Sequence, residues 1–460
     1  MASVPGVSGT TAIRMRERLA APLVSGLWLG AAALFGIAFP LALNSASGTM
    51  ARVLPAAIVV ATAMLLLAVT RPDWLLITAF ALLAFVRVEP APVDLAFLLL
   101  IVVVAFRARQ DGLLVPPGVL VSLLLFVPIT ILSLINSTAW AESLKFEATT
   151  LYLLAFAALL PTMLQRFGVV AGAVKAYIIV AVFSALLGVL AVKPGFPGSH
   201  ALLFDQYRTQ AFFKDPNVFG PFLVPALIIV LEELVRPRLL GWSVGLTRIV
   251  GFILALGLLF SFSRAAILNA VLGAITLFVI YLGRRRGRSA ALKLGLSAAA
   301  CAVVGLIVLV ATNQFSFFES RSHLQSYDHS RFASQGAGFK EASVHVFGHG
   351  PGQVGVDLPL ATHSTYARVA YEQGYIGLAL IIAILVGTLI AAIKFARRDG
   401  DISGLGSGAL LAAWVGLLAN SFFIDTLHWR HLWIFAGLIW YGAMTVRRRS
   451  PAEQHEALET

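Results

Sequence analysis

Residues 246–288 read LTRIVGFILALGLLFSFSRAAILNAVLGAITLFVIYLGRRRGR, and this stretch decides the fold. As a single helix, its apolar part would extend about 55 Å at 1.5 Å per residue, whereas the hydrocarbon core of a bilayer is roughly 30 Å thick. The chain must therefore turn at SFSR, residues 261–264, and form two adjacent membrane spans. The turn places Arg264 at one face of the membrane and RRRGR, residues 284–288, at the other.

The composition of the whole chain agrees with this reading. Of its 460 residues 59% are hydrophobic and only 12% are charged, and the mean hydropathy is +0.88. Soluble domains contain about 25% charged residues. The sequence therefore predicts an all-α polytopic membrane protein. Its single cysteine, Cys301, excludes an intramolecular disulfide framework.

Apolar runs long enough to cross a bilayer predict about fourteen transmembrane helices, with about twelve as the lower limit. They fall near 23–43, 52–70, 73–88, 93–106, 116–135, 143–161, 169–192, 217–235, 246–262, 264–282, 291–312, 364–393, 404–424 and 431–446.

These runs suggest how the chain is organised. We expect an N-terminal tail (1–22), N-terminal membrane helices (23–192), a catalytic region (193–446) and a C-terminal tail (447–460). The catalytic region includes a large loop, 313–363, between the eleventh and twelfth spans. A loop this long in a compact protein is usually functional or disordered.

The basic residues set the orientation. Most of the 34 lysines and arginines fall on one side of the predicted map, which the positive-inside rule identifies as cytoplasmic. Both termini are then cytoplasmic, and Arg264 and the two longest loops, 193–216 and 313–363, are on the outer face. This asymmetry accounts for the net charge of +12 without a nucleic-acid partner.

One candidate site lies in YRTQAFFKDPNVFG, residues 207–220. Asp215 before Pro216 is typical of a helix N-cap, so a span should begin here at the outer face. Its free N–H groups favour an anion, and Arg208 and Lys214 precede it. The alternative is that Asp215 satisfies the helix end and the basic side chains are merely solvated.

A second candidate is Arg264, with Ser261 and Ser263 available as caps. The alternative role is an arginine that reaches the lipid headgroups.

A third candidate is HSTYARVAYEQGYIGL, residues 363–378. Arg368 and Glu372 are four residues apart and should form an ion pair that braces the helix. On a helix, His363 would lie about 180° around from Glu372 and so would not share its face. It would instead lie at the outer end of the helix, where a neutral imidazole can accept a proton.

Other patterns are weaker. HVFGH places His345 and His349 four residues apart, but its glycine and loop setting argue against a helical metal site. GHGPG lacks the context of a nucleotide-binding loop. DTLHWRH, residues 425–431, forms another cluster on the outer face.

The motifs RTQAFFKDPNVFG, SFSRAAIL, GHGPGQ and HSTYARVAYEQGYIGL occur in an order that resembles the O-antigen ligase and O-antigen polymerase superfamily, over roughly residues 200–440. The chain departs from the family pattern at DPN and in its larger number of spans.

The resemblance implies a metal-independent, cofactor-free glycosyltransferase of the bacterial inner membrane with a periplasmic active site. It would move a glycan from undecaprenyl pyrophosphate to an acceptor sugar hydroxyl, with inversion, in O-antigen or exopolysaccharide synthesis. Arg208 and Arg264, with Lys214, would hold the pyrophosphate and His363 would serve the acceptor. Asp215, Asn217, Arg368 and Glu372 would support them.

The number of spans favours a polymerase, whose acceptor is another lipid-linked glycan. The first alternative is a ligase, whose acceptor is lipid A–core. Other polysaccharide-assembly proteins are expected partners in either case. A different class, a transporter or flippase for lipid-linked glycans, also needs basic groups on the outer face, but transporters usually place polar groups near the midplane. A scaffold with a periplasmic loop domain would not explain arginines on separate helices.

Overall fold

A computed structural model describes residues 50–445, apart from 108–112, 194, 206, 285–286, 324 and 359. The expected first span, 23–43, and the tails 1–22 and 447–460 lie outside these residues. Each of the other expected spans coincides with a helix.

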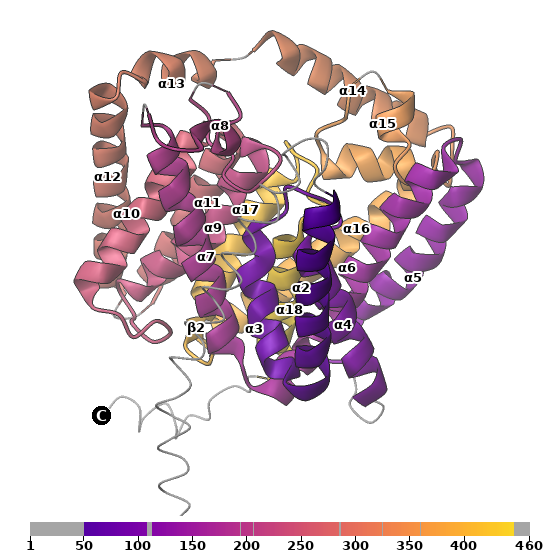
Figure 1. Ribbon diagram of the computed structural model, residues 1–460, viewed down its shortest axis with the longest axis horizontal. Coiled ribbons are helices and arrows are strands. Elements are labelled where there is room, and N and C mark those ends of the chain that lie inside the picture. The colour runs from indigo at the N-terminus through magenta and orange to yellow at the C-terminus, as the bar shows by residue number, and fades with distance from the viewer. Residues whose placement is uncertain are drawn as a thin grey trace, which may run out of the picture.

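The first half of the described chain is a series of antiparallel helices joined by short connections (Figure 1). They are α2 (Met50–Thr70), α3 (Pro72–Ala81), α4 (Pro92–Arg107), α5 (Pro117–Ser133), α6 (Trp140–Phe167) and α7 (Val170–Ala191), with the 3-10 turns η1 (Leu82–Ala84) and η2 (Leu134–Asn136) after α3 and α5.

The second half contains further long helices and two long loops, one with α8 and one with α13, α14 and α15. The elements are α8 (Ser199–Leu202), α9 (Pro216–Glu233), α10 (Val244–Phe260), α11 (Arg264–Leu282), α12 (Arg288–Ala311), α13 (Phe315–Ser322), α14 (Ser326–Ala342), α15 (Val354–Asp357), α16 (Thr365–Arg397), the hairpin β1 (Asp401–Ile402) and β2 (Leu405–Gly406), α17 (Ser407–Asn420) and α18 (Arg430–Thr445).

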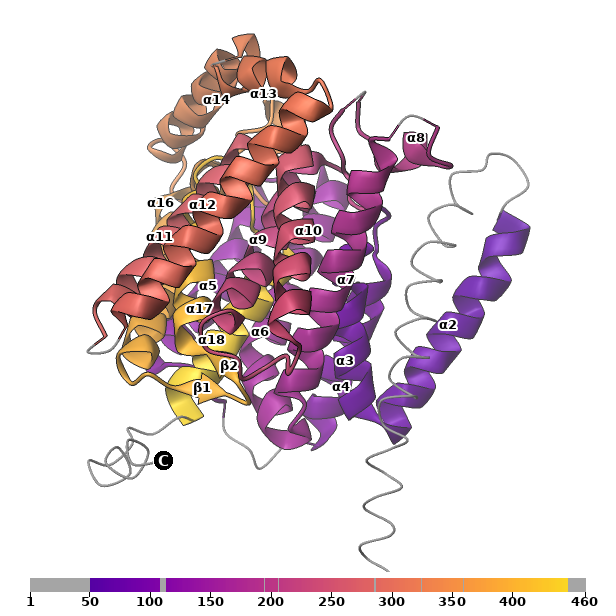
Figure 2. The same cartoon turned by 90° about the vertical axis from the view of Figure 1, so that its left-hand side faces the viewer.

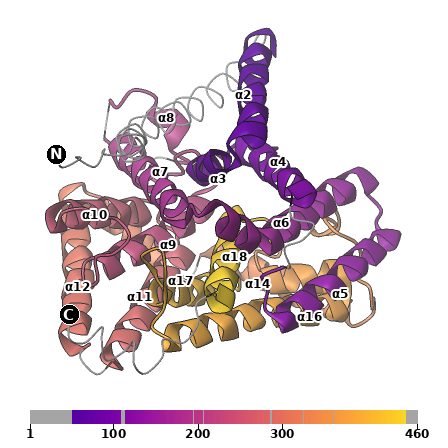
Figure 3. The ribbon, with the colours of Figure 1, turned by 90° about the horizontal axis from the view of Figure 1, so that it is seen from below.

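The core lies where the later helices pack together. Seen from below, α17 and α18 occupy the centre of the bundle, and α5 and α16 run side by side at one edge (Figure 3). Trp414, Trp433 and Trp440 are fully buried there. In contrast, α2 leans away from its neighbours (Figure 2) and exposes apolar side chains such as Leu66, 63% of whose surface is accessible. Apolar side chains facing outward are expected where lipid surrounds the protein.

Seven helices in the described part of the chain are long and apolar enough to cross a membrane, judged by length and composition. They are α5 with η2, α6, α7, α9, α11, α12 and α16; shorter apolar helices lie at 58–70, 72–84, 92–106, 244–260 and 407–420. The all-α membrane class is therefore confirmed, while fourteen spans remains a prediction.

The predicted turn at SFSR is confirmed, because α10 ends at Phe260 and α11 begins at Arg264. The long loop 313–363 contains α13, α14 and α15, which lie across one end of the bundle together with α8 (Figure 1). We call this the capped end. The β1–β2 hairpin lies at the opposite end (Figure 2).

Candidate functional site

Three of the helices that begin at the capped end, α9, α11 and α16, define the candidate site with their first residues. The N-cap prediction at α9 is confirmed: the Asp215 Oδ1 accepts the Asn217 backbone N–H at 2.7 Å, and Pro216 occupies the first helical position. α11 begins with Ser263 as its cap and Arg264 as its first residue. Sequence segments far apart therefore present polar groups to one end of the bundle.

Arg208 ties the first long loop to this end. Its guanidinium donates to the Asn217 Oδ1 at 3.3 Å and to the Ser261 carbonyl at 3.4 Å, and only 6% of the residue is exposed. Burial lowers the pKa of Arg208, and the charge of Arg321 lowers it further, although a guanidinium stays protonated at neutral pH. Arg208 thus connects the start of α9 to the turn just before Arg264.

Arg264 contacts the second long loop. One of its terminal nitrogens donates to both carboxylate oxygens of Asp328, at 2.7 and 2.8 Å, and the other donates to the His323 carbonyl at 3.1 Å. Burial alone would raise the pKa of the Asp328 carboxyl. The hydrogen bonds from Arg264 and the Gln325 backbone outweigh burial, so the pKa lies below its ordinary value. Arg264 is therefore held against the first turn of α14.

A cavity of about 230 Å³ opens between α11, α13 and α14. Of the residues that the structure describes, three with guanidinium groups line it, Arg264, Arg321 and Arg331, but only one with a carboxylate, Asp328. Asn217 also lines the cavity. Arg208 does not line it directly but is connected to its wall by the hydrogen bond to the Asn217 Oδ1. The excess of positive charge suits a polyanionic ligand such as a diphosphate.

His363 lies directly before the N-cap of α16, in a left-handed backbone conformation with φ of 47°. Burial lowers the pKa of His363 below its ordinary 6.5, and the charge of Arg331 lowers it further, while Asp215 and Asp425 act in the opposite direction. The charges of Arg331 on α14 and of Asp215 at the start of α9 both act on the imidazole, although His363 is not among the residues that line the cavity. The ring is neutral at physiological pH and able to accept a proton.

The predicted ion pair of Arg368 and Glu372 is confirmed at 3.0 Å. Arg368 also pairs with Asp425 at 2.6 Å and lies over the Phe146 ring, 4.0 Å from its centroid. Asp425 belongs to the DTLHWRH cluster, so that cluster partly serves to brace α16. These contacts fix the helix whose start carries His363.

The structure does not bring Lys214 into the cavity. Its ammonium pairs with Glu89 at 2.9 Å, the side chain is 51% exposed, and it is absent from the cavity wall. The predicted pyrophosphate contact by Lys214 would require this pair to open.

Sequence reasoning missed the residues of α13 and α14 that line the cavity. The sequence alone identifies the loop 313–363 as a whole but singles out neither Arg321 nor Arg331. One available signal was the capping box that starts α14, in which the Gln325 and Asp328 side chains satisfy backbone groups reciprocally. It would have indicated a helix at 326–342 with Arg331 on its second turn.

A second, apolar hollow of about 420 Å³ lies between α10, α11 and α12. Ile267, Val271 and Ala274 of α11 line it, and Phe318 of α13 contributes from the capped end. α11 therefore lines a cationic cavity at its first turn and an apolar hollow along its next turns.

Fold and site together define an all-α membrane protein with a cationic cavity at one end of its helix bundle. Residues 249–382 match the family described as O-antigen ligase. This segment contains α11, the loop helices and His363, and the match supports membership of the O-antigen ligase and O-antigen polymerase superfamily. The match supports a glycosyltransferase of that type. No curated protein matches the sequence.

Proposed function

We propose that the protein transfers a glycan from undecaprenyl pyrophosphate to an acceptor sugar hydroxyl at the periplasmic face of the bacterial inner membrane. The proposal rests above all on α11, which lines both the cationic cavity and the apolar hollow. A polyprenyl diphosphate has the matching two parts, an anionic head and an apolar tail. The tail would lie in the hollow while the head occupies the cavity.

The chemistry needs positive charge at the leaving group. As the glycosidic bond breaks, the pyrophosphate gains negative charge, and fixed cations that bind the developing charge lower the barrier. A unit charge at 4 Å is worth about 4 kcal/mol at an effective dielectric constant of 20. Arg264 and Arg331 would contact the diphosphate, and Arg208 would position Asn217 beside it.

The pair between Arg264 and Asp328 adds a condition to this mechanism. A diphosphate must either displace Asp328 from the Arg264 guanidinium or share the guanidinium with it. Donor binding would then loosen α14 from α11, and departure of the diphosphate would restore the pair.

His363 would act as the general base. The neutral imidazole would take the proton of the acceptor hydroxyl as its oxygen attacks the anomeric carbon, and the bond to the diphosphate oxygen would break with inversion. General-base catalysis of this kind contributes about 10²–10⁴-fold.

The acceptor separates two candidates. We favour a polymerase, which elongates another lipid-linked glycan, on the predicted number of spans. The matching family's description as an O-antigen ligase favours the second candidate, transfer to lipid A–core.

The deciding experiment incubates the purified protein with lipid-linked repeat units, with and without lipid A–core. Longer lipid-linked glycans without core would support a polymerase, and product that requires core would support a ligase. If the protein forms no product in either reaction but moves lipid-linked units across proteoliposome membranes, it is a transporter.

A further inference from the structure

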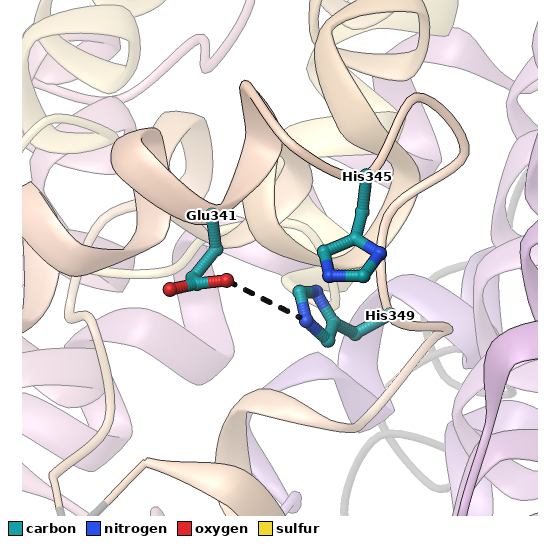
Figure 4. A group of neighbouring side chains, drawn as sticks. All are labelled: Glu341, His345 and His349. Carbon is teal, nitrogen blue, oxygen red and sulfur yellow. Dashed lines mark ion pairs between the residues drawn. The ribbon is translucent and has the colours of Figure 1, made fainter.

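The end of α14 carries a group of side chains that the proposed transfer does not use. Glu341, in the last turn of the helix, lies beside His345 and His349 (Figure 4). One potential ligand atom from each residue lies within 4.8 Å of the other two. The glycine and the loop setting of HVFGH argued against a metal site on a helix, but the structure assembles this group from a helix end and a loop.

The local backbone brings the two histidines together. The His345 backbone N–H donates to the Glu341 carbonyl at 3.1 Å, which adds a turn beyond the end of α14. Gly348 then adopts φ of 69°, a conformation that favours glycine, and the backbone turns there. The rings of His345 and His349 have their centroids 4.2 Å apart.

His349 is fixed from the other side by α16. Its backbone N–H donates to the Tyr371 carbonyl at 2.9 Å, and its ring stacks on the Tyr371 ring at 4.2 Å. A Cβ at Gly348 would lie 2.3 Å from the Glu372 backbone, so the loop has no room to shift inward. The imidazole is therefore held in place before any ligand binds.

The group has unsatisfied polar atoms. Within the described part of the chain, the buried His349 Nδ1 has no hydrogen-bond partner. The His349 Nε2 lies 3.9 Å from the Glu341 carboxylate, which is beyond hydrogen-bonding distance. Buried polar atoms are normally paired, so Nδ1 lacks an expected partner, and Nε2 faces the Glu341 carboxylate across a gap too long for a hydrogen bond. His345 is exposed and leaves a path from solvent.

We propose that Glu341, His345 and His349 bind a divalent transition metal ion, with Zn²⁺ the best match. Two imidazole nitrogens and one carboxylate form a ligand set typical of zinc, with water completing the coordination. Bonds of about 2.0–2.2 Å in tetrahedral geometry separate ligand atoms by roughly 3.3–3.5 Å. The 3.9 Å between Glu341 and the His349 Nε2 must close by about half an ångström, and the other separations, all within 4.8 Å, by up to about 1.5 Å. Rotation of the half-exposed Glu341 and the exposed His345 side chains would supply these shifts.

The position of the site makes it a brace for α14. Asp328 and Glu341 are thirteen residues apart, so the metal would lie about 20 Å along the helix from Asp328. The ion would join the end of α14 to the loop that docks on α16. It would thereby hold the helix that carries Asp328 and Arg331.

The test titrates Co²⁺ into the intact, detergent-solubilised protein, purified without a histidine tag, and records the d–d absorption bands of the ion. We expect the wild-type protein to bind one equivalent, and Zn²⁺ to displace it. His345→Ala, His349→Ala and Glu341→Gln should each bind Co²⁺ at least tenfold more weakly. His329→Ala, which removes an exposed histidine from the same helix, is the matched control and should bind as the wild type does.

Thermal unfolding without metal verifies that each variant is folded. Should His349→Ala fail to fold, His345→Ala and Glu341→Gln decide the question. Wild-type protein that takes up no Co²⁺, or His345→Ala and Glu341→Gln proteins that bind it with wild-type affinity, would overturn the proposal. The readout is metal binding, so the result is independent of whether the protein transfers glycans.

Discussion

Arginines meet carboxylates at both ends of the bundle, but the balance of charge differs. At the hairpin end, Arg236 and Arg284 both pair with Asp399, and Arg238 pairs with Asp401. Glu233 accepts backbone N–H groups of residues 238–240. Each of these carboxylates has a partner within the protein, so the contacts close a joint between α9, α11 and the β1–β2 hairpin.

In the cavity at the capped end, the guanidinium groups among the described lining residues outnumber the carboxylates. Among the described residues of its lining, Arg264, Arg321 and Arg331 share the cavity with one carboxylate, that of Asp328. The same residue types therefore serve two purposes. A balanced set fastens segments to one another, whereas an unbalanced set around a cavity favours an incoming anion.

The largest expected effect is at His363. His363→Ala should reduce transfer about 10²–10⁴-fold, because the acceptor hydroxyl loses its general base. The measurement is the rate of product formation from lipid-linked repeat units. His200→Ala, at an exposed histidine of the same end, should keep the wild-type rate. Full activity of His363→Ala would remove this residue from the mechanism.

The pH dependence of the wild-type rate sharpens the role of His363. Its pKa is lowered, so the active neutral form persists until the pH falls below 6.5. The rate should therefore be flat near pH 7 and decline as the pH falls through the lowered pKa. A rate that rises on acidification would mean that a protonated group is required instead.

Arg264 should come next. Arg264→Ala should slow transfer about 10²–10³-fold, as expected when a group that stabilises developing charge is removed. The protein should still insert into the membrane. Arg264→Lys should also be impaired, because an ammonium cannot grip phosphate oxygens with two parallel bonds. A near-normal rate for the lysine variant would show that charge alone suffices.

The cavity arginines that sequence reasoning missed should show a smaller effect. Arg331→Ala should slow transfer roughly tenfold, equivalent to about 1.4 kcal/mol in the barrier. Because Arg331 lines the cavity proposed to bind the diphosphate, inorganic pyrophosphate should also inhibit the variant more weakly. Unchanged rate and unchanged inhibition would show that the cavity does not bind the diphosphate.

The smallest effect on transfer should be at the hairpin end. Arg236→Ala should leave the rate within about twofold of wild type and lower the free energy of unfolding by at most about 1 kcal/mol, since the pair is partly exposed. Thermal unfolding in detergent and the transfer assay measure both quantities. Loss of transfer as large as that of Arg331→Ala would break the distinction between the two ends.

The sequence predicted the helices well because hydropathy is a property of each segment alone. It also predicted the caps at Asp215 and Ser263 and the pair of Arg368 with Glu372, all of which involve neighbours along one helix. Such contacts can be predicted without knowing how distant segments pack.

The remaining contacts depend on such packing. Glu89 is far from Lys214 in the sequence, and nothing local indicates their pairing. Arg264 and Asp328 are likewise brought together only when α14 folds across the capped end. Gly374 is one of many glycines in the sequence, and only the structure shows that it breaks α16, with φ of 68°.

The break at Gly374 has a consequence for how this protein can diversify. The loop after α14 is attached through main-chain carbonyls of Tyr371 and Glu372, which accept the backbone N–H groups of His349 and Gly350. Main-chain attachment places few demands on side-chain identity. Exposed positions such as Val344 and Val346 can therefore be exchanged freely in a library to alter the outer surface, provided that the glycines at 348, 350 and 374 are kept.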